Sequence, residues 1–143
     1  MSKRVAELFL FDIYVAILKI EKVAEKFNNP ESLLHDFVHW DSIIREFEII
    51  GEASKHLING GLLDKNYRVV VDFRNLLIHN YFGIDPEAVW NVIKEDLPKF
   101  KDAIANSINC IDNALKKQLI DSYIEANKHL NFVVTELEKF KKP

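Results

Sequence analysis

Apolar residues recur every three or four positions along most of this chain, the spacing that places them on one face of an α-helix. The pattern is densest near the N-terminus, where it predicts a helix from about residue 2, with Ser2 as its N-cap, to about residue 27. This helix is apolar on more than one side, so we expect either the fold or a second copy of the chain to bury it. Its apolar positions include Val5, Leu8, Phe11, Val15 and Leu18, flanked by Leu10, Ile13, Ile17 and Ile20.

Turn and cap residues divide the rest of the chain into further helices. Asn29, placed as an N-cap before Pro30, predicts a second helix that runs to about residue 58, where Asn-Gly-Gly at 59–61 ends it. A third helix is expected at about 66–79, and Asp-Pro-Glu at 85–87 repeats the start signal for a fourth. Pro98 either kinks that fourth helix or begins a fifth.

The final third of the chain contains no Gly and no Pro between residues 99 and 142. Its apolar residues keep a heptad-like spacing, which predicts a long helical arm, at Leu130, Val133, Leu137 and Phe140. With few helix breakers and no sustained alternation of apolar and polar residues, the fold class is predicted to be all-α. We expect an antiparallel up-and-down helical bundle with an extended C-terminal helix.

Composition narrows the class of protein further. A chain of 143 residues is long enough for one domain with a real core. Its formal charge of −3 gives no global attraction to nucleic acid, so any such contact must come from a local patch. The lone cysteine, Cys110, cannot form an internal disulfide, which fits the cytoplasm. No uncharged run approaches the roughly 20 residues of a membrane helix, so we expect no membrane partner.

The third predicted helix carries the candidate chemistry, in the stretch DFRNLLIHNYFGIDP at 72–86. On a helix that turns about 100° per residue, Tyr81 lies about 20° from Arg74 and shares its face. Asn75 and His79, at about 100° and 140° from Arg74, share another face. The remaining side is expected to face the core and holds Leu76 and Leu77.

One regular helix therefore does not bring Arg74 and His79 to a common point. Either the helix unwinds near His79, where Gly83 lies close by, or two copies of the chain pool their residues along one groove. An imidazole that exchanges protons near neutral pH and an arginine that grips phosphate suit RNA cleavage without a metal or cofactor. Solvated side chains with no catalytic role are the plainer alternative.

The octapeptide from Arg74 to Tyr81, RNLLIHNY, resembles the R-x4-H-x-Y signature of HEPN-domain ribonucleases, in particular the HepT-like toxins of HEPN/MNT toxin–antitoxin pairs. Two flanking segments resemble the same family. They are IIREFEIIGEASKHL at 43–57, with its I-G-E-A core, and YFGIDPEAVW at 81–90. Together the similarity spans roughly residues 5–100.

The resemblance implies a homodimeric helical bundle with a composite active site in the cleft between its subunits. It implies metal-independent RNA endonuclease activity in which Arg74 and His79 are the catalytic pair and Asn75 supports them. Tyr81 would be the residue to which an MNT-type nucleotidyltransferase antitoxin transfers AMP, in a type VII-like system. On this basis residues 1–115 form the HEPN-like domain, and residues 116–143 form an amphipathic extension of it.

Several weaker features leave alternatives open. HDFVH at 35–39 has the spacing of a zinc site, but it lacks the glutamate of such motifs and an evident third ligand. Glu52 is expected either to pair with Arg74, to hydrogen-bond His79, or to be a plain surface carboxylate. Arg68 could extend a phosphate-binding strip. The alternatives to a ribonuclease are a non-catalytic nucleotide- or RNA-binding partner of a nucleotidyltransferase, and a purely structural helical dimer.

Overall fold

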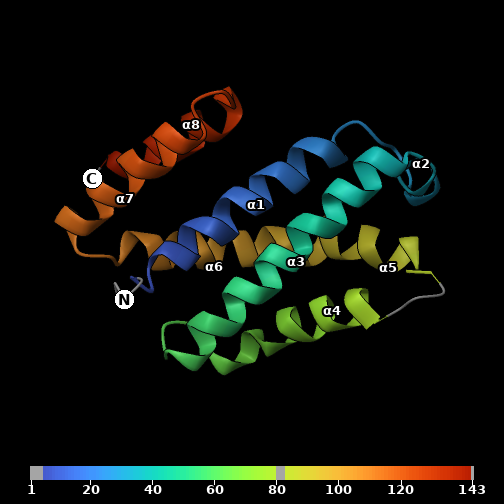
Figure 1. Cartoon of the computed structure of the whole chain (residues 1–143), viewed down its shortest axis with the longest axis horizontal. Coiled ribbons are helices and arrows are strands. Elements are labelled where there is room, and N and C mark those ends of the chain that lie inside the picture. The colour runs from blue at the N-terminus through green and yellow to red at the C-terminus, as the bar shows by residue number, and fades with distance from the viewer. Residues whose placement is uncertain (1–4, 80–82, 143) are drawn as a thin grey trace.

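The computed structural model describes residues 5–79 and 83–142, and every regular element in these ranges is helical (Figure 1). The all-α prediction is confirmed. In chain order the elements are α1 (Leu8–Ala24), α2 (Pro30–His35), α3 (Phe37–Asn59), η1 (Lys65–Tyr67), α4 (Arg68–His79), α5 (Pro86–Asn91), η2 (Val92–Asp96), α6 (Leu97–Asn109), α7 (Asn113–Ala126), α8 (Asn131–Glu138) and η3 (Lys139–Lys141).

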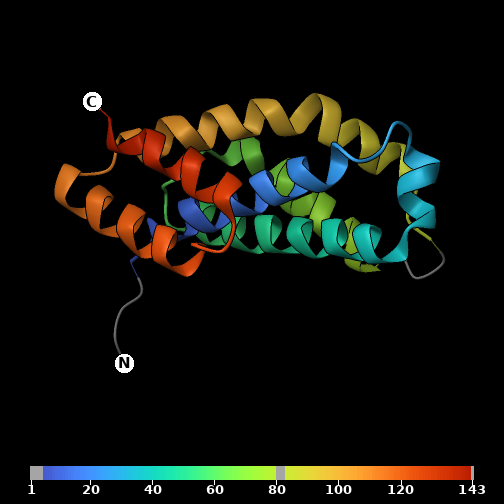
Figure 2. The same ribbon diagram turned by 90° about the horizontal axis from the view of Figure 1, so that it is seen from above.

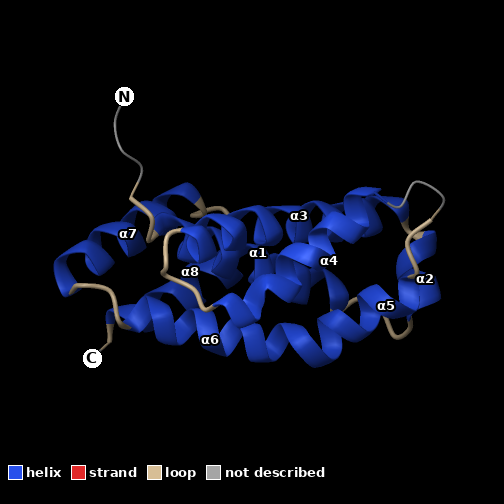
Figure 3. Ribbon diagram, turned by 90° about the horizontal axis from the view of Figure 1, so that it is seen from below, coloured by secondary structure: helices blue, strands red, loops and turns tan. Residues whose placement is uncertain are grey.

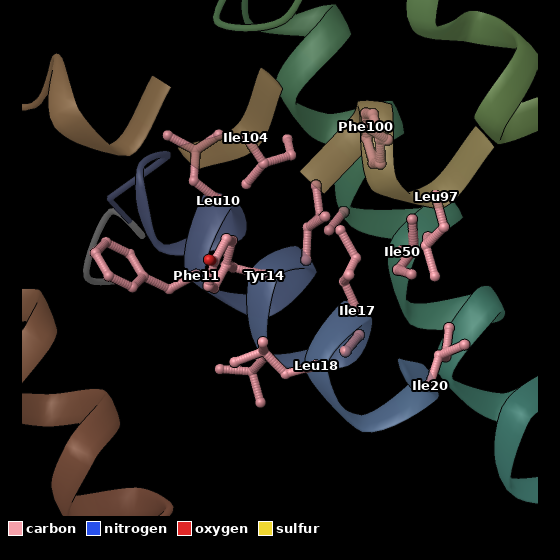
Figure 4. Packing of buried hydrophobic residues seen from close by; sticks show 14 of the residues in the cluster. Leu10, Phe11, Tyr14, Ile17, Leu18, Ile20, Ile50, Leu97, Phe100 and Ile104 are labelled. Atoms are coloured by element: carbon pink, nitrogen blue, oxygen red, sulfur yellow. The ribbon is translucent and has the colours of Figure 1, made fainter. Parts of the chain in front are cut away.

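Helix α1 lies inside the bundle, with α3 along one side and α6 along the other (Figure 2). This position explains its broad apolar surface, because neighbours within the same chain cover most of its circumference. Figure 4 shows the α1 side chains Leu10 and Ile17 packed among buried residues of the neighbouring helices, with Ile50 from α3 and Leu97 and Phe100 from α6. The helix begins at Leu8 rather than near residue 2, and Ser2 lies outside the described residues.

Both predicted Asx–Pro helix starts are confirmed, each by a side-chain cap. The Asn29 side chain accepts a hydrogen bond from the backbone N–H of Ser32 at 2.9 Å, with Pro30 in the first turn of α2. The Asp85 carboxylate accepts one from the backbone N–H of Glu87 at 3.0 Å at the start of α5. Such caps satisfy donors that a helix start leaves without intrahelical partners.

The helix predicted to run from Pro30 to residue 58 is instead broken at Asp36. This residue leaves the helical backbone conformation, and its carboxylate caps α3 by accepting from the backbone N–H of His39 at 3.2 Å. A short acceptor side chain that competes for backbone donors can thus end one helix and start the next without Gly or Pro. Farther along, a π-helical segment, η2, precedes α6, and Pro98 lies in the first turn of α6, where its missing N–H is tolerated.

The prediction of one extended C-terminal helix is wrong. The last third folds into two helices, α7 and α8, which pack against each other and against α1 (Figure 3). Asp112 caps α7 through the backbone N–H of Leu115, and the Asn127 amide donates to the Tyr123 carbonyl where α7 ends. The apolar positions that suggested a coiled-coil arm face this chain's own core instead, since Val133, Leu137 and Phe140 are all buried.

The Tyr123 hydroxyl ties this C-terminal hairpin to the first helix. It lies 3.0 Å from the Leu8 carbonyl, to which it can donate, and 2.5 Å from a carboxylate oxygen of Asp12. The proposed boundary after Leu115 falls inside α7, and the division at that point stays a prediction. Within residues 5–79 and 83–142, none of the helices combines the length and the apolar character that crossing a bilayer requires.

If the hairpin shares the core, Leu137→Ala will lower the stability of the whole chain. Leu137 is 0% exposed, so its truncation should cost about 2–5 kcal/mol of unfolding free energy. Urea unfolding followed by circular dichroism measures this cost and should show one cooperative transition. Leu76→Ala, at a leucine that is 56% exposed, is the control and should change the free energy of unfolding by less than about 1 kcal/mol. A separate early transition for the hairpin would contradict the prediction.

Candidate functional site

Arg74 is held where α4 packs closely against α3. The backbone of Gly51 approaches the stem of Arg74 so closely that a Cβ on Gly51 would lie 2.2 Å from Arg74 Cβ and 2.5 Å from its Cγ. Any side chain at position 51 would therefore displace Arg74 or separate the helices. The structure explains each residue of the I-G-E-A segment. Ile50 and Ala53 are buried in the core, Gly51 packs against the stem of Arg74, and Glu52 is exposed beside it.

Two side chains orient the Arg74 guanidinium. Nη2 lies 3.0 Å from a carboxylate oxygen of Glu52, and Nη1 donates to the side-chain oxygen of Asn75 at 3.0 Å. Nε is buried and has no hydrogen-bond partner among the described residues. A buried donor without a partner costs about 1–3 kcal/mol, so packing against Gly51, rather than a bond at Nε, determines where the stem lies. Of the partners considered for Glu52, the structure shows Arg74.

His79 is the last residue of α4 and is exposed. The helix stays regular up to that point, so it does not unwind between Arg74 and His79. Asn75 and His79, which the spacing predicts to share a face of the helix, are both exposed, whereas Arg74 turns inward toward α3. Arg68 begins α4 and is exposed, away from the Arg74 pair. The expectation that two leucines face the core is half right, because Leu77 is buried and Leu76 is not.

Tyr81 lies outside the described residues, so its predicted place on the Arg74 face is not part of the observed site.

The HDFVH segment is described, and its geometry differs from the expectation. The break at Asp36 separates His35, in α2, from His39, in α3, so the two imidazoles do not share one regular helix. His39 instead pairs with Asp36 at 2.9 Å, which lowers the pKa of the Asp36 carboxyl. In the described part of the chain, no group of three or more His, Cys, Asp or Glu side chains could hold a metal ion.

A groove of about 290 Å³ lies beside Arg74, over the outer face of α3. His56 borders this region: its Nε2 lies 3.9 Å from Glu52, and its ring stacks on Phe9 with centroids 4.7 Å apart. The residues that line the groove are Phe9, Asp12, Arg45, Glu48, Ile49, Glu52, Ala53 and Arg74.

Arg45 is the site residue that the sequence analysis missed. It shares the groove with Arg74 and forms no ion pair with any described residue. Its charge acts on the half-buried Glu46, whose pKa is raised by burial while Lys19 and Arg45 oppose that shift. The signal was present in the spacing, because Arg45, Glu48 and Glu52 lie at i, i+3 and i+7 and must share one face of a helix.

The fold and this site define an all-α protein with an arginine-centred polar groove and an exposed histidine at the end of the same helix. Comparison with known proteins places it more closely: residues 13–107 match the family described as Ribonuclease HepT-like. The chain belongs to the HepT-like ribonuclease family, a group of HEPN proteins, and the resemblance seen in its motifs is confirmed.

Two relatives show how far the similarity extends. A Methanocaldococcus jannaschii protein named as a candidate RNase, MJ1380, is 36% identical over 108 residues, which cover 73% of this chain and 97% of that protein. A Thermococcus cleftensis protein named as a candidate ribonuclease HepT is 37% identical over 102 residues, 69% of this chain and 92% of that protein. No solved structure matches the chain. Helices α7 and α8 lie beyond the residues that match the family.

The close contact at Gly51 gives a direct test of how the site is held. Gly51→Ala should lower the free energy of unfolding by about 1–3 kcal/mol, because the added Cβ meets Arg74 Cβ. In an Arg74→Gly background the atoms that clash are gone, so the same substitution should cost markedly less. Urea unfolding of the four chains gives the coupling between the two positions. Equal costs in both backgrounds would contradict the contact.

Proposed function

We propose that the chain is the toxin of a HEPN/MNT toxin–antitoxin pair and cleaves RNA in the cytoplasm without a metal. The observation that carries this proposal is the fixed Arg74: in a member of a ribonuclease family, packing against Gly51 and bonds to Glu52 and Asn75 orient both of its terminal nitrogens. A planar, permanently charged fork of this kind suits recognition of a phosphate by two hydrogen bonds.

In the proposed reaction, the ribose 2′-oxygen attacks the adjacent phosphorus and the bond to the 5′-oxygen breaks. The products are a 2′,3′-cyclic phosphate and a 5′-hydroxyl end. His79 transfers a proton, either from the attacking hydroxyl or to the departing oxygen, because imidazole exchanges protons near neutral pH. Arg74 stabilises the charge that develops on the phosphate oxygens. Asn75 supports Arg74 by holding its Nη1.

The geometry of α4 favours a homodimer as the active form. Arg74 and His79 are five residues apart, which is a rise of about 7.5 Å and a turn of about 140° on a regular helix. One chain therefore does not direct both groups at one phosphate along this helix. A two-fold arrangement that brings α4 of each subunit to a shared groove would supply the arginine and histidine from both copies.

Substrate must compete with Glu52 for Arg74. The Glu52 side chain is 51% exposed and that of Arg74 is 26% exposed, and pairs of this kind contribute only about 0–1 kcal/mol. A phosphate can replace this carboxylate at little cost, so Glu52 would hold the arginine in place before RNA arrives. The same ion pair also supports the alternative function. An arginine whose charge is balanced by Glu52 suits a non-catalytic nucleotide- or RNA-binding partner of a nucleotidyltransferase as well.

We also propose that Tyr81 is the site of neutralisation by a nucleotidyltransferase antitoxin. Transfer of AMP to its hydroxyl would add bulk and a negative phosphate two residues from His79. That group would occupy the groove, pair with an arginine and repel RNA, as other added phosphates do.

Replacement of His79 separates the ribonuclease from the binding partner. His79→Gln should slow cleavage by about 10²–10⁴-fold, and Arg74→Gln by about 10²–10³-fold, while both chains stay folded. The assay is cleavage of labelled RNA by the purified chain in EDTA, with analysis of the ends for a cyclic phosphate. His129→Gln, at an exposed histidine of the hairpin, is the matched control and should be fully active. A wild-type chain that binds RNA but never cleaves it would favour the non-catalytic alternative.

Regulation can be tested by co-expression with the cognate nucleotidyltransferase. The wild-type chain should stop arresting growth and should carry AMP on Tyr81 by mass spectrometry. Tyr81→Phe should cleave RNA when expressed alone, remain unmodified in the presence of the partner, and stay toxic. Neutralisation of Tyr81→Phe to the same extent as wild type would show that modification of Tyr81 is not the control.

A further inference from the structure

A second hollow, of about 430 Å³, lies where α1 and α6 meet the C-terminal hairpin. Figure 2 shows the end of α8 and η3 beside α6, whereas α3, which holds Glu52, runs along the opposite edge of the molecule. Its polar lining comes from five segments of the chain and is cationic in balance. The lining residues that matter are Tyr14, Asn109, Lys116, Glu136, Lys139 and Lys142.

The Tyr14 hydroxyl is the unusual group in this pocket. The residue is only 6% exposed, and its oxygen makes no hydrogen bond with any described residue. Burial, reinforced by Glu136, Glu21 and Asp102, raises the pKa of Tyr14 to about 12. The hydroxyl therefore keeps its proton under all ordinary conditions and can donate it. The hydroxyl oxygen is not one of the buried atoms that lack a partner, so it opens onto the pocket and is available to donate to an acceptor on a ligand.

The lysines of the hairpin divide into two groups. Those directed elsewhere have acidic partners: Lys117 and Lys141 share the carboxylate of Asp121, and Lys128 pairs with Glu125. Both of these partners and all three lysines lie outside the pocket lining. On this outer surface every one of the three lysines therefore has an acidic partner, although two of them share one carboxylate.

Within the pocket the balance differs. Lys139 bonds to Glu136 at 2.9 Å, which cancels one charge, but Lys116 and Lys142 form no ion pair with any described residue. The pocket lining thus keeps two uncompensated ammonium groups and also includes the Tyr14 hydroxyl. One wall is apolar, where the rings of Tyr14 and Phe140 meet edge to face with centroids 5.0 Å apart.

We propose that this pocket binds a phosphate-bearing ligand, with the phosphate at Lys116, Lys142 and the Tyr14 hydroxyl. A volume of about 430 Å³ exceeds what one phosphate fills and is in the range of small-ligand sites, so the ligand carries a further group, such as a nucleoside. The lysines and Phe140 lie beyond residues 13–107, whereas Tyr14 lies within them, so the site forms where the hairpin meets the part that matches the family. The phosphate can belong to a free nucleotide or to an RNA chain.

The test is binding to the full chain at fixed, low ionic strength, measured by isothermal titration with ADP, inorganic pyrophosphate and a short single-stranded RNA. Arg74→Gln is included as a background, so that binding at the proposed ribonuclease groove is removed. We expect saturable binding in that background. Lys116→Gln should weaken it about tenfold, the usual effect of losing one hydrogen bond to a charged group. Tyr14→Phe, which keeps the buried ring, should weaken it several-fold.

Two further variants make the result specific. Lys117→Gln, at the adjacent lysine outside the pocket, should bind like the background chain. Glu136→Gln removes the carboxylate from the pocket and should tighten binding, a change opposite in sign to that of Lys116→Gln. Binding of ADP or pyrophosphate identifies a free nucleotide as the source, and binding of RNA alone identifies a nucleic-acid phosphate.

Absence of saturable binding of all three probes, or equal weakening by Lys116→Gln and Lys117→Gln, would overturn the proposal. The outcome is independent of RNA cleavage: a chain that cleaves RNA but binds no phosphate in the Arg74→Gln background refutes the pocket alone. A chain that binds through Lys116 but never cleaves RNA refutes the ribonuclease proposal alone.

Discussion

Where α4 crosses α3, the stem of Arg74 occupies the space that a side chain at position 51 would need, so only glycine fits there. The orientation of the whole site follows from this contact. With Arg74 directed at α3, the periodicity of α4 turns Val71 and Leu77 toward the core and leaves Asn75 and His79 facing solvent. The residue after Gly51 on α3 is then the one that meets the guanidinium. One glycine therefore sets both the distance between two helices and the identity of the arginine's partner.

The position of the Arg74 stem and the direction of its guanidinium are controlled by different interactions. Packing determines where the stem lies, and it does so even at the expense of leaving Nε buried without a partner among the described residues. The ion pair with Glu52 determines only where the outer end of the guanidinium points, and it is exposed enough to be weak. A substrate phosphate can therefore replace Glu52 without moving the arginine's backbone or stem. A rigid stem with an exchangeable counter-ion is the kind of preorganisation that a phosphate site needs.

Sequence reasoning succeeded where the determinant is local. The fold class, the caps at Asn29 and Asp85 and the exposed pair Asn75 and His79 follow from helical periodicity and from side chains that bond a few residues away. It failed where a competing local hydrogen bond, or a contact between segments far apart in the sequence, determines the structure. Asp36 ends one helix by capping the next, and neither Gly nor Pro marks this break in the sequence.

The hairpin shows the second kind of failure. Its apolar spacing is equally compatible with an arm that meets another chain and with helices that fold back, and only contacts with α1, such as that of Tyr123, choose between them. Arg45 was missed for a related reason: its spacing from Glu52 predicts a shared face, but only the position of α4 shows that this face borders the site of Arg74. Both the folding back of the hairpin and the place of Arg45 beside Arg74 depend on long-range packing, which no single segment encodes.

Net charge gives little guidance to what this protein binds, because charges at its surface act over short distances. At physiological ionic strength the Debye length is about 8 Å, so the formal charge of −3 is not what a ligand meets at a groove. A ligand meets the local balance instead. Next to Arg74 that balance includes Arg45, which has no carboxylate partner among the described residues. In the hairpin pocket it includes Lys116 and Lys142, whose neighbours Lys117 and Lys141 share the carboxylate of Asp121. The pairing of adjacent lysines, rather than their number, separates a solvated surface from a site for an anion.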